Sequence, residues 1–278
     1  MLKNRALSTA LLAALACAAG SGTAQAAGTK RTAAEVRPVS VPARGLSLLS
    51  RAIRQHHAVG NMKSTNWAGY AVTGGTYTSV AANWIEPSVT CTSNGIVGFW
   101  VGLDGWGSTS VEQDGTGVDC EKGTPQQFAW WETYPENSVQ VYSAPVTAGD
   151  RMSSSIVSQG HGRYVMVLTD WTARWTIKNP VTLPSARNAS AEIVAEAVTS
   201  GDNITTLPDF GAIGFTGSTI NNDSLQDQSA QPIDMTDAAD NVIATTTDAD
   251  PNGDFIVNYA GTMSSAPLRS TSRLYNNA

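Results

Sequence analysis

The sequence has 278 residues, with 23 Asp and Glu against 17 Lys and Arg, and its formal net charge at pH 7 is −6. This acidic balance argues against nucleic acids and anionic membranes as partners, because both carry negative charge and attract basic proteins. The chain also has only three histidines and three cysteines for nucleophilic or metal chemistry.

Residues 1–26 have the pattern of a secretory signal peptide. Two bases, Lys3 and Arg5, precede a small apolar run that leads to the cleavage pattern Ala24-Gln25-Ala26. No later segment approaches the ~20 apolar residues of a transmembrane helix. We therefore expect a secreted, extracellular protein.

Residues 27–63 differ in charge from the rest of the chain. They contain seven bases and the single acid Glu35, a formal charge of +6, whereas residues 64–278 carry 8 bases and 22 acids, a charge of −14. Such a basic arm is either an exposed tail or a pro-segment. We favour a pro-segment that inhibits its own body, because the arm ends where dense β patterning begins.

Residues 64–278 read as a succession of short strands separated by turn residues. The runs are rich in Val, Ile, Thr, Tyr and Trp, and none shows sustained helical periodicity. We expect one all-β catalytic domain, a sandwich of two packed antiparallel sheets of the lectin-like or jelly-roll type, and a monomer. The clearest strands are predicted at 67–75, 77–87, 97–105, 127–135, 163–170, 212–220 and 254–261.

The run 191–198 places two acids among apolar residues. As a strand, it puts Glu192 and Glu196 on one face, about 13 Å apart along the backbone. As a helix, it makes them an ordinary i, i+4 surface pair. The all-β setting favours the strand, although Ala and Glu prefer helices.

The cysteines agree with export. Cys17 leaves with the signal peptide, which leaves Cys91 and Cys120 able to form a disulfide. A loop of this size would contribute ~3–4 kcal/mol in the chain-entropy model. The alternative is a pair of buried thiols.

Most common catalytic groups are excluded. Two histidines, His56 and His57, lie in the predicted pro-segment, and His161 lies in a turn-like stretch. No serine has a G-x-S-x-G setting, and neither zinc motifs nor the Asp-Thr/Ser-Gly signature of aspartic peptidases occur. We expect no metal and no cofactor, so acid–base chemistry falls to carboxyl and carboxamide groups.

Three further polar residues lie in strand-like apolar surroundings, and each also has a structural interpretation. Asp104 could cap a turn, Gln113 could point outward from an edge strand, and Glu132 could be a solvated neighbour of two tryptophans. Individually, none of them indicates a site.

In this order along the chain, however, the residues resemble the glutamic endopeptidases, the eqolisin family. That resemblance implies a secreted enzyme with a pro-segment, a fold of two antiparallel sheets, and cleavage of proteins at acidic pH without inhibition by pepstatin. The matching pieces are 66-NWAGY-70, 100-WVGLDG-105, 112-EQDG-115, 130-WWETYP-135, 191-AEIVAE-196 and 209-DFG-211.

The resemblance also implies roles for individual residues. The family's catalytic pair falls on Gln113 and Glu196, whereas Glu192 is given no role. The positions that line or support the substrate cleft fall on Trp67, Trp100, Asp104, Glu132 and Tyr134.

The chemistry suits these residue types. A glutamate with the ordinary pKa of ~4.3 is partly ionised at about pH 4, so it can take a proton from an attacking water and return it to the leaving amine. A glutamine amide does not titrate, and it can orient the water and stabilise the oxyanion. The alternatives are a carbohydrate-binding sandwich module and a glycosidase that uses Glu132 and Glu196.

Overall fold

The structure is a computed structural model. It describes residues 61–200, 203–228 and 230–261, together with the backbone of three short strands nearer the N-terminus. These strands are β1 (Ala34–Val36), β2 (Ser40–Pro42) and β3 (Leu46–Ser47). The predicted signal peptide lies outside the described residues, as does most of the predicted pro-segment. No helix in the described part of the chain is long and apolar enough to span a membrane.

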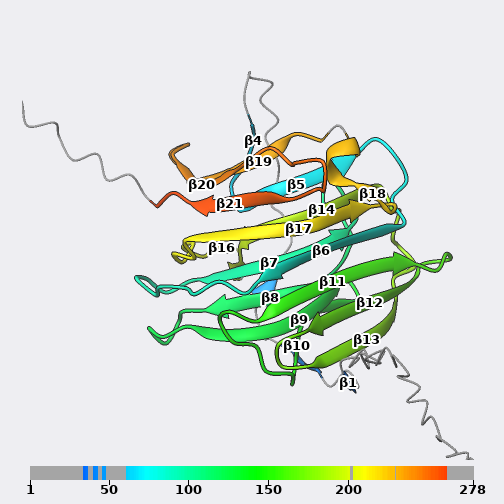
Figure 1. The fold of residues 1–278 in the computed structure, drawn as a ribbon, viewed down its shortest axis with the longest axis horizontal. Helices are drawn as coiled ribbons and strands as arrows, with labels where there is room; N and C mark the ends of the chain where they lie inside the picture. Colours follow the sequence, from blue (N-terminus) through cyan, green and yellow to red (C-terminus); the bar gives the residue numbers. More distant parts are fainter. Residues whose placement is uncertain are drawn as a thin grey trace, which may run out of the picture. The chain divides into compact units, whose positions relative to one another are not determined.

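From residue 61 onward, the described chain is built almost entirely of strands (Figure 1). The elements are β4 (Met62–Ser64), β5 (Trp67–Thr73), β6 (Ser79–Ile85), β7 (Ile96–Leu103), β8 (Val111–Asp119), β9 (Gln126–Tyr134), β10 (Asn137–Tyr142), β11 (Arg151–Ser158), β12 (Arg163–Asp170), β13 (Trp175–Thr182), β14 (Ser190–Ala197), β15 (Thr199–Ser200), β16 (Asn203–Ile204), β17 (Ala212–Ile220), β18 (Asp223–Ser224), the 3-10 helix η1 (Leu225–Gln228), β19 (Pro232–Thr236), β20 (Val242–Thr246) and β21 (Phe255–Tyr259). The prediction of an all-β domain is confirmed.

The strands form two mainly antiparallel sheets. The first sheet has the order β13–β12–β11–β6–β17, and the second has the order β10–β9–β8–β7–β14–β5–β19. One end of β17 pairs with β6 in the first sheet, and its other end pairs with β21 in the second. A large apolar core that includes Phe99, Val101, Ile156 and Leu168 lies between the two sheets.

The strand β12 shows how the sequence produces this packing. Tyr164, Met166 and Leu168 alternate along the strand and are buried, whereas Val165 and Val167 on the other face are only partly buried. This period-two pattern was predicted from the sequence, because one face of each outer strand must meet the core.

The strand β14 settles the question raised by residues 191–198. It lies in the interior of the second sheet, paired antiparallel with β5 on one side and with β7 on the other. Both of its edges are hydrogen-bonded and all of its residues are buried, so tertiary pairing overrides the helical preference of Ala and Glu.

The second sheet has an additional apolar cluster on the face that points away from the main core. We call this surface the aromatic face. It is built from Trp67, Ala71, Ile96, Trp100, Trp106, Trp130, Val139, Val194, Val198 and Ile233. Four of these ten side chains are tryptophans.

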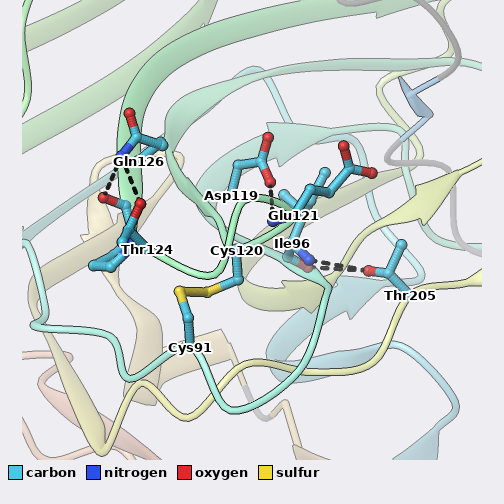
Figure 2. Close-up of a disulfide and its surroundings, with 9 residues drawn as sticks. Cys91, Ile96, Asp119, Cys120, Glu121, Thr124, Gln126 and Thr205 are labelled. Carbon is cyan, nitrogen blue, oxygen red and sulfur yellow. Dashed lines mark hydrogen bonds between the residues drawn. A yellow bond between two sulfur atoms is a disulfide. The ribbon is translucent and has the colours of Figure 1, made fainter.

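A disulfide joins Cys91 and Cys120, as predicted, with an S–S distance of 1.99 Å (Figure 2). Cys91 precedes β7 and Cys120 follows β8, so the bond ties together the ends of these paired strands. Next to it, the backbone N–H of Ile96 donates to Thr205 Oγ1 at 3.2 Å, which attaches the segment after β16 to β7.

The three short strands of the predicted pro-segment pair with the body. β1 runs parallel to β13 at the edge of the first sheet, and β2 runs antiparallel to β10 at the edge of the second. β3 pairs antiparallel with β15, where Ser47 lies opposite Thr199. These main-chain contacts therefore involve both sheets.

Candidate active site

Gln113 lies in the interior of the second sheet and not on an edge strand. On β8 it is paired with Gly102 of β7 and with Glu132 of β9. Its Nε2 donates a hydrogen bond of 2.6 Å to Glu132 Oε2. Gln113 Oε1 is buried and has no hydrogen-bond partner among the described residues.

β7, the strand next to Gln113, requires a glycine at position 102. A Cβ at Gly102 would lie 2.8 Å from the Trp100 ring and 3.2 Å from Gln113 Cβ. Contacts this short would displace both side chains. The absence of a side chain at position 102 therefore lets Trp100 and Gln113 lie side by side on the aromatic face.

Glu196 lies on the same face of the sheet, on β14, and is fully buried. Asn66 Nδ2 donates to its Oε1 at 2.8 Å, and Trp100 Nε1 donates to its Oε2 at 3.0 Å. These two donors fix the orientation of the carboxyl group. Asn66 was not among the predicted site residues, although it is the first residue of the 66-NWAGY-70 piece.

Burial raises the pKa of Glu196 well above its ordinary value. The N–H dipoles of Trp67, Trp100 and Asn66 favour the ionised form, whereas the nearby charge of Glu132 disfavours it. Trp67 Nε1 makes no hydrogen bond of ordinary geometry within the described chain. The ordinary pKa assumed from the sequence is therefore wrong for the buried site, because a sequence does not reveal desolvation.

Glu132 connects the two predicted catalytic residues. It accepts the hydrogen bond from Gln113, and its charge affects the ionisation of Glu196. Gln113, Glu132 and Glu196 thus lie on one face of three strands. Gln113 is hydrogen-bonded to Glu132, and Glu196 lies beside the indole of Trp100, within range of the Glu132 charge. Glu132 is fully buried, so it is not the solvated neighbour that its sequence setting allowed.

Asp104 and Tyr134 lie at strand ends. Asp104 follows β7 with a positive φ of 70° and accepts backbone hydrogen bonds of 2.5–2.7 Å from residues 187–189. Its described contacts are therefore those of a turn anchor. Tyr134 is the last residue of β9, two positions after Glu132 and on the same face of the strand.

Sequence reasoning also missed two tryptophans and three buried acids. Trp106 and Trp130 belong to the aromatic face. Glu86, Glu112 and Asp114 are buried, with Glu112 and Asp114 on the opposite face of β8 from Gln113. The alternation along β8 could have indicated this placement, but an acid is ordinarily assigned to the solvent side.

Among the residues that the structure describes, no group of three or more His, Cys, Asp or Glu side chains is placed to hold a metal ion.

Two curated relatives are similar in sequence. Aspergillopepsin-2 from Aspergillus niger is 27% identical over 178 residues, which cover 55% of this chain and 63% of the relative. Scytalidopepsin B from Scytalidium lignicola is 31% identical over 117 residues, covering 42% of this chain and 44% of the relative. The chain spans less than two thirds of the length of these relatives.

Solved structures show the same fold. Scytalido-glutamic peptidase with a transition state analog inhibitor aligns with a TM-score of 0.62 at 20% identity, over 70% of this chain and 98% of that one. Aspergilloglutamic peptidase from Aspergillus niger aligns with a TM-score of 0.53 at 22% identity, over 59% and 98% of the two chains. The two-sheet sandwich is therefore shared with both.

The Peptidase A4 family model matches residues 65–259, a span that contains the strands carrying Gln113, Glu132 and Glu196 and the disulfide between Cys91 and Cys120. With this match over most of its length, the chain belongs to the Peptidase A4 family.

Proposed function

We propose that the chain is a secreted glutamic endopeptidase that hydrolyses peptide bonds in proteins at acidic pH, with Gln113 and Glu196 as its catalytic residues. The observation that carries this proposal is the placement of Gln113, Glu132 and Glu196 on one face of the sheet, where a hydrogen bond joins Gln113 to Glu132. A peptide ligand suits this family, since SCP-B, a member of the eqolisin family, has been solved in a complex with the tripeptide Ala-Ile-His.

Glu196 acts as the general base and then as the general acid. Once water reaches the site, the N–H donors of Asn66 and Trp100 stabilise the Glu196 carboxylate. The carboxylate takes a proton from water while the water oxygen forms a bond to the scissile carbonyl carbon. It returns that proton to the amide nitrogen as the C–N bond breaks, so no proton is gained or lost over the cycle. The hydrogen bonds from Asn66 and Trp100 keep the carboxyl oxygens in place for both steps.

Gln113 orients the water and stabilises the oxyanion. One of its Nε2 hydrogens is held by Glu132, which fixes the rotation of the amide. The second hydrogen can then donate to the developing oxyanion, and Oε1 can accept a hydrogen bond from the attacking water. Because the amide does not titrate, this arrangement persists at acidic pH.

The predicted pro-segment, residues 27–63, acts as the inhibitor of this site. β2 pairs with β10, next to the strand of Glu132, and β3 pairs with β15, three residues after Glu196. Main-chain pairing favours binding of the pro-segment over the aromatic face. The opposite charges of residues 27–63 and 64–278 favour it as well. A covered face excludes both substrate and water from Glu196, so its carboxyl group has no water from which to take a proton.

We expect the precursor to process itself in acid. At about pH 4 the carboxylates of the body lose charge while the arginines keep theirs, so the electrostatic attraction weakens. The mass of purified precursor should then fall at about pH 4 but stay constant at about pH 7. The Glu196→Gln precursor should stay intact at both pH values, and equal processing of both proteins would refute self-activation.

The proposed activity is tested with two kinds of substrate. Mature protein is incubated at about pH 4 with denatured casein and, separately, with a panel of soluble glycans. Release of peptides without glycan binding or cleavage supports the peptidase. Glycan retention or cleavage without peptide release would support the carbohydrate-directed alternatives.

Gln113→Ala is expected to lower kcat about 10²–10³-fold, the cost of one oxyanion donor, or about 2.7–4 kcal/mol. The variant also removes the partner of Glu132. Steady-state kinetics on a peptide substrate measures the loss, with circular dichroism confirming that the sheet persists. A kcat within about tenfold of the parent protein would remove Gln113 from the mechanism.

A further inference from the structure

Glu192 is a fully buried carboxyl group that the proposed peptidase mechanism does not use. It lies on β14 between Ala71 of β5 and Gly102 of β7, on the same face as Glu196. A buried acid costs stability unless its oxygens are hydrogen-bonded. Glu192 Oε1 accepts a hydrogen bond from the loop between β7 and β8, residues 104–110, which we call the Trp106 loop.

The Trp106 loop is attached to β14 at its backbone. Glu192 Oε1 accepts a hydrogen bond of 3.0 Å from the backbone N–H of Trp106, and Ser190 Oγ lies 3.1 Å from the same nitrogen. A Cβ at Gly105 would lie 3.4 Å from the Glu192 carboxyl carbon, so the backbone passes directly against this side chain. The carboxyl group of Glu192 therefore helps to position the loop, together with the Ser190 hydroxyl and the hydrogen bonds that Asp104 accepts from the backbone.

The Trp106 side chain continues this contact towards Glu196. Its ring centroid lies 5.8 Å from that of Trp67, and the Trp67 centroid lies 5.0 Å from that of Trp100, in an edge-to-face arrangement. Trp100 in turn donates its indole N–H to Glu196. Three packed indoles thus connect the hydrogen bond at Glu192 with the proposed catalytic carboxyl group.

Trp106 is the least buried of the four indoles of the aromatic face. It is 8% exposed, whereas Trp67, Trp100 and Trp130 are 0–1% exposed. Of these indoles, Trp106 is therefore the most accessible to a substrate side chain. A large aromatic wall of this kind favours large apolar side chains, because their burial against it removes the most apolar area from water.

Resting on the proposed peptidase function, we infer that Glu192 is a positioning residue, which holds the Trp106 loop so that the Trp106 indole binds a large apolar side chain of the peptide substrate. Glu192 acts as a hydrogen-bond acceptor and does not exchange protons with the substrate. Burial raises its pKa to about 8, so in acid the group is neutral and its carbonyl oxygen still accepts from the Trp106 N–H.

Two substitutions of similar size distinguish the role of Glu192 as a hydrogen-bond acceptor from any role of its ionisation. Glu192→Gln keeps a carbonyl oxygen for the Trp106 N–H, whereas Glu192→Leu removes it. We expect Glu192→Leu to raise KM about tenfold for a substrate with a large apolar side chain, with kcat changed less than about threefold. Glu192→Gln should keep KM within about twofold of the parent protein.

A double-mutant cycle tests whether Glu192 acts through Trp106. Trp106→Ala alone should raise KM at least about tenfold, and adding Glu192→Leu to it should cause no further increase.

Amide hydrogen exchange gives a second readout that needs no activity: the Trp106 amide should exchange faster in Glu192→Leu but not in Glu192→Gln. Glu112→Gln is the matched control, because its carboxyl group is also buried but makes no hydrogen bond to the Trp106 loop.

The inference is overturned by additive effects in the cycle, by an unchanged KM in Trp106→Ala, or by equal exchange of the Trp106 amide in all variants. If Glu192→Leu does not fold, an unchanged KM in Trp106→Ala still overturns the inference. A parent protein that cleaves no peptide contradicts the proposed function. In that case the exchange experiment still decides whether Glu192 positions the loop.

Discussion

Glu196→Gln is expected to abolish peptide hydrolysis, with kcat lowered about 10⁴-fold or more, because both the proton acceptor and the later proton donor are lost. The substitution keeps the size of the side chain. Its new amide nitrogen faces a donor at Trp100 or Asn66, but rotation of the Asn66 amide offers Oδ1 as an acceptor. The fold should therefore persist, and circular dichroism at about pH 4 checks this.

Glu192→Gln provides the matched comparison for this loss. It makes the same chemical change on the same strand and face, four residues earlier, and retains the acceptor for the Trp106 N–H. Its activity should stay within about tenfold of the parent protein. An inactive Glu192→Gln beside an active Glu196→Gln would show that the two acids have been assigned the wrong way round.

The fold was predictable where short-range pattern and packing agree. The strands at 163–170 and 212–220 were predicted with the bounds of β12 and β17, because their apolar residues alternate between turn residues. β11 was missed because Ser153, Ser154 and Ser155 interrupt its pattern. Ser154 is nevertheless buried, and its hydroxyl donates to Asp114 across the two sheets, a contact that only the folded structure reveals.

The residues of the proposed site could be named from the sequence, but their hydrogen bonds and burial could not. The resemblance supplied Gln113 and Glu196, and elimination of other chemistries left only carboxyl and carboxamide groups. The hydrogen bond between Gln113 and Glu132 depends on the register of β8 against β9. The two residues are 19 positions apart, and the sequence alone does not reveal that they lie opposite each other. The role of Asn66 depends likewise on the register between the start of β5 and the end of β14.

Register also explains the buried acids. Along β8, the face opposite Gln113 carries Glu112, Asp114, Thr116 and Val118, all of them buried. Burial raises the pKa of Glu112 to about 9 and that of Asp114 to about 7. Burial also raises the pKa of Glu86 to about 8, although Thr116 and Trp84 donate hydrogen bonds to it. Burial in this fold therefore favours the neutral form of several carboxyl groups.

The protein should consequently be stable in acid and unfold as the solution becomes alkaline. In the unfolded chain these carboxyl groups titrate near their ordinary values of ~4, whereas in the folded protein they keep their protons to a higher pH. Their contribution to stability is complete below about pH 4 and is lost progressively as the pH rises towards about 8–9. Each pKa unit corresponds to about 1.4 kcal/mol, so a few such groups can match the whole ~5–15 kcal/mol stability of a domain.

Urea denaturation followed by circular dichroism at about pH 4, 6 and 8 measures this loss, and the midpoint should fall steadily across the series. Glu86→Gln should reduce the fall, because its amide stays neutral and its carbonyl oxygen still accepts from Thr116. Glu136→Gln, an exposed change in the β9–β10 turn, is the control and should leave the pH dependence of the urea midpoint unaltered. Equal midpoints at about pH 4 and 8 would mean that water reaches these carboxyl groups and that their burial does not govern stability.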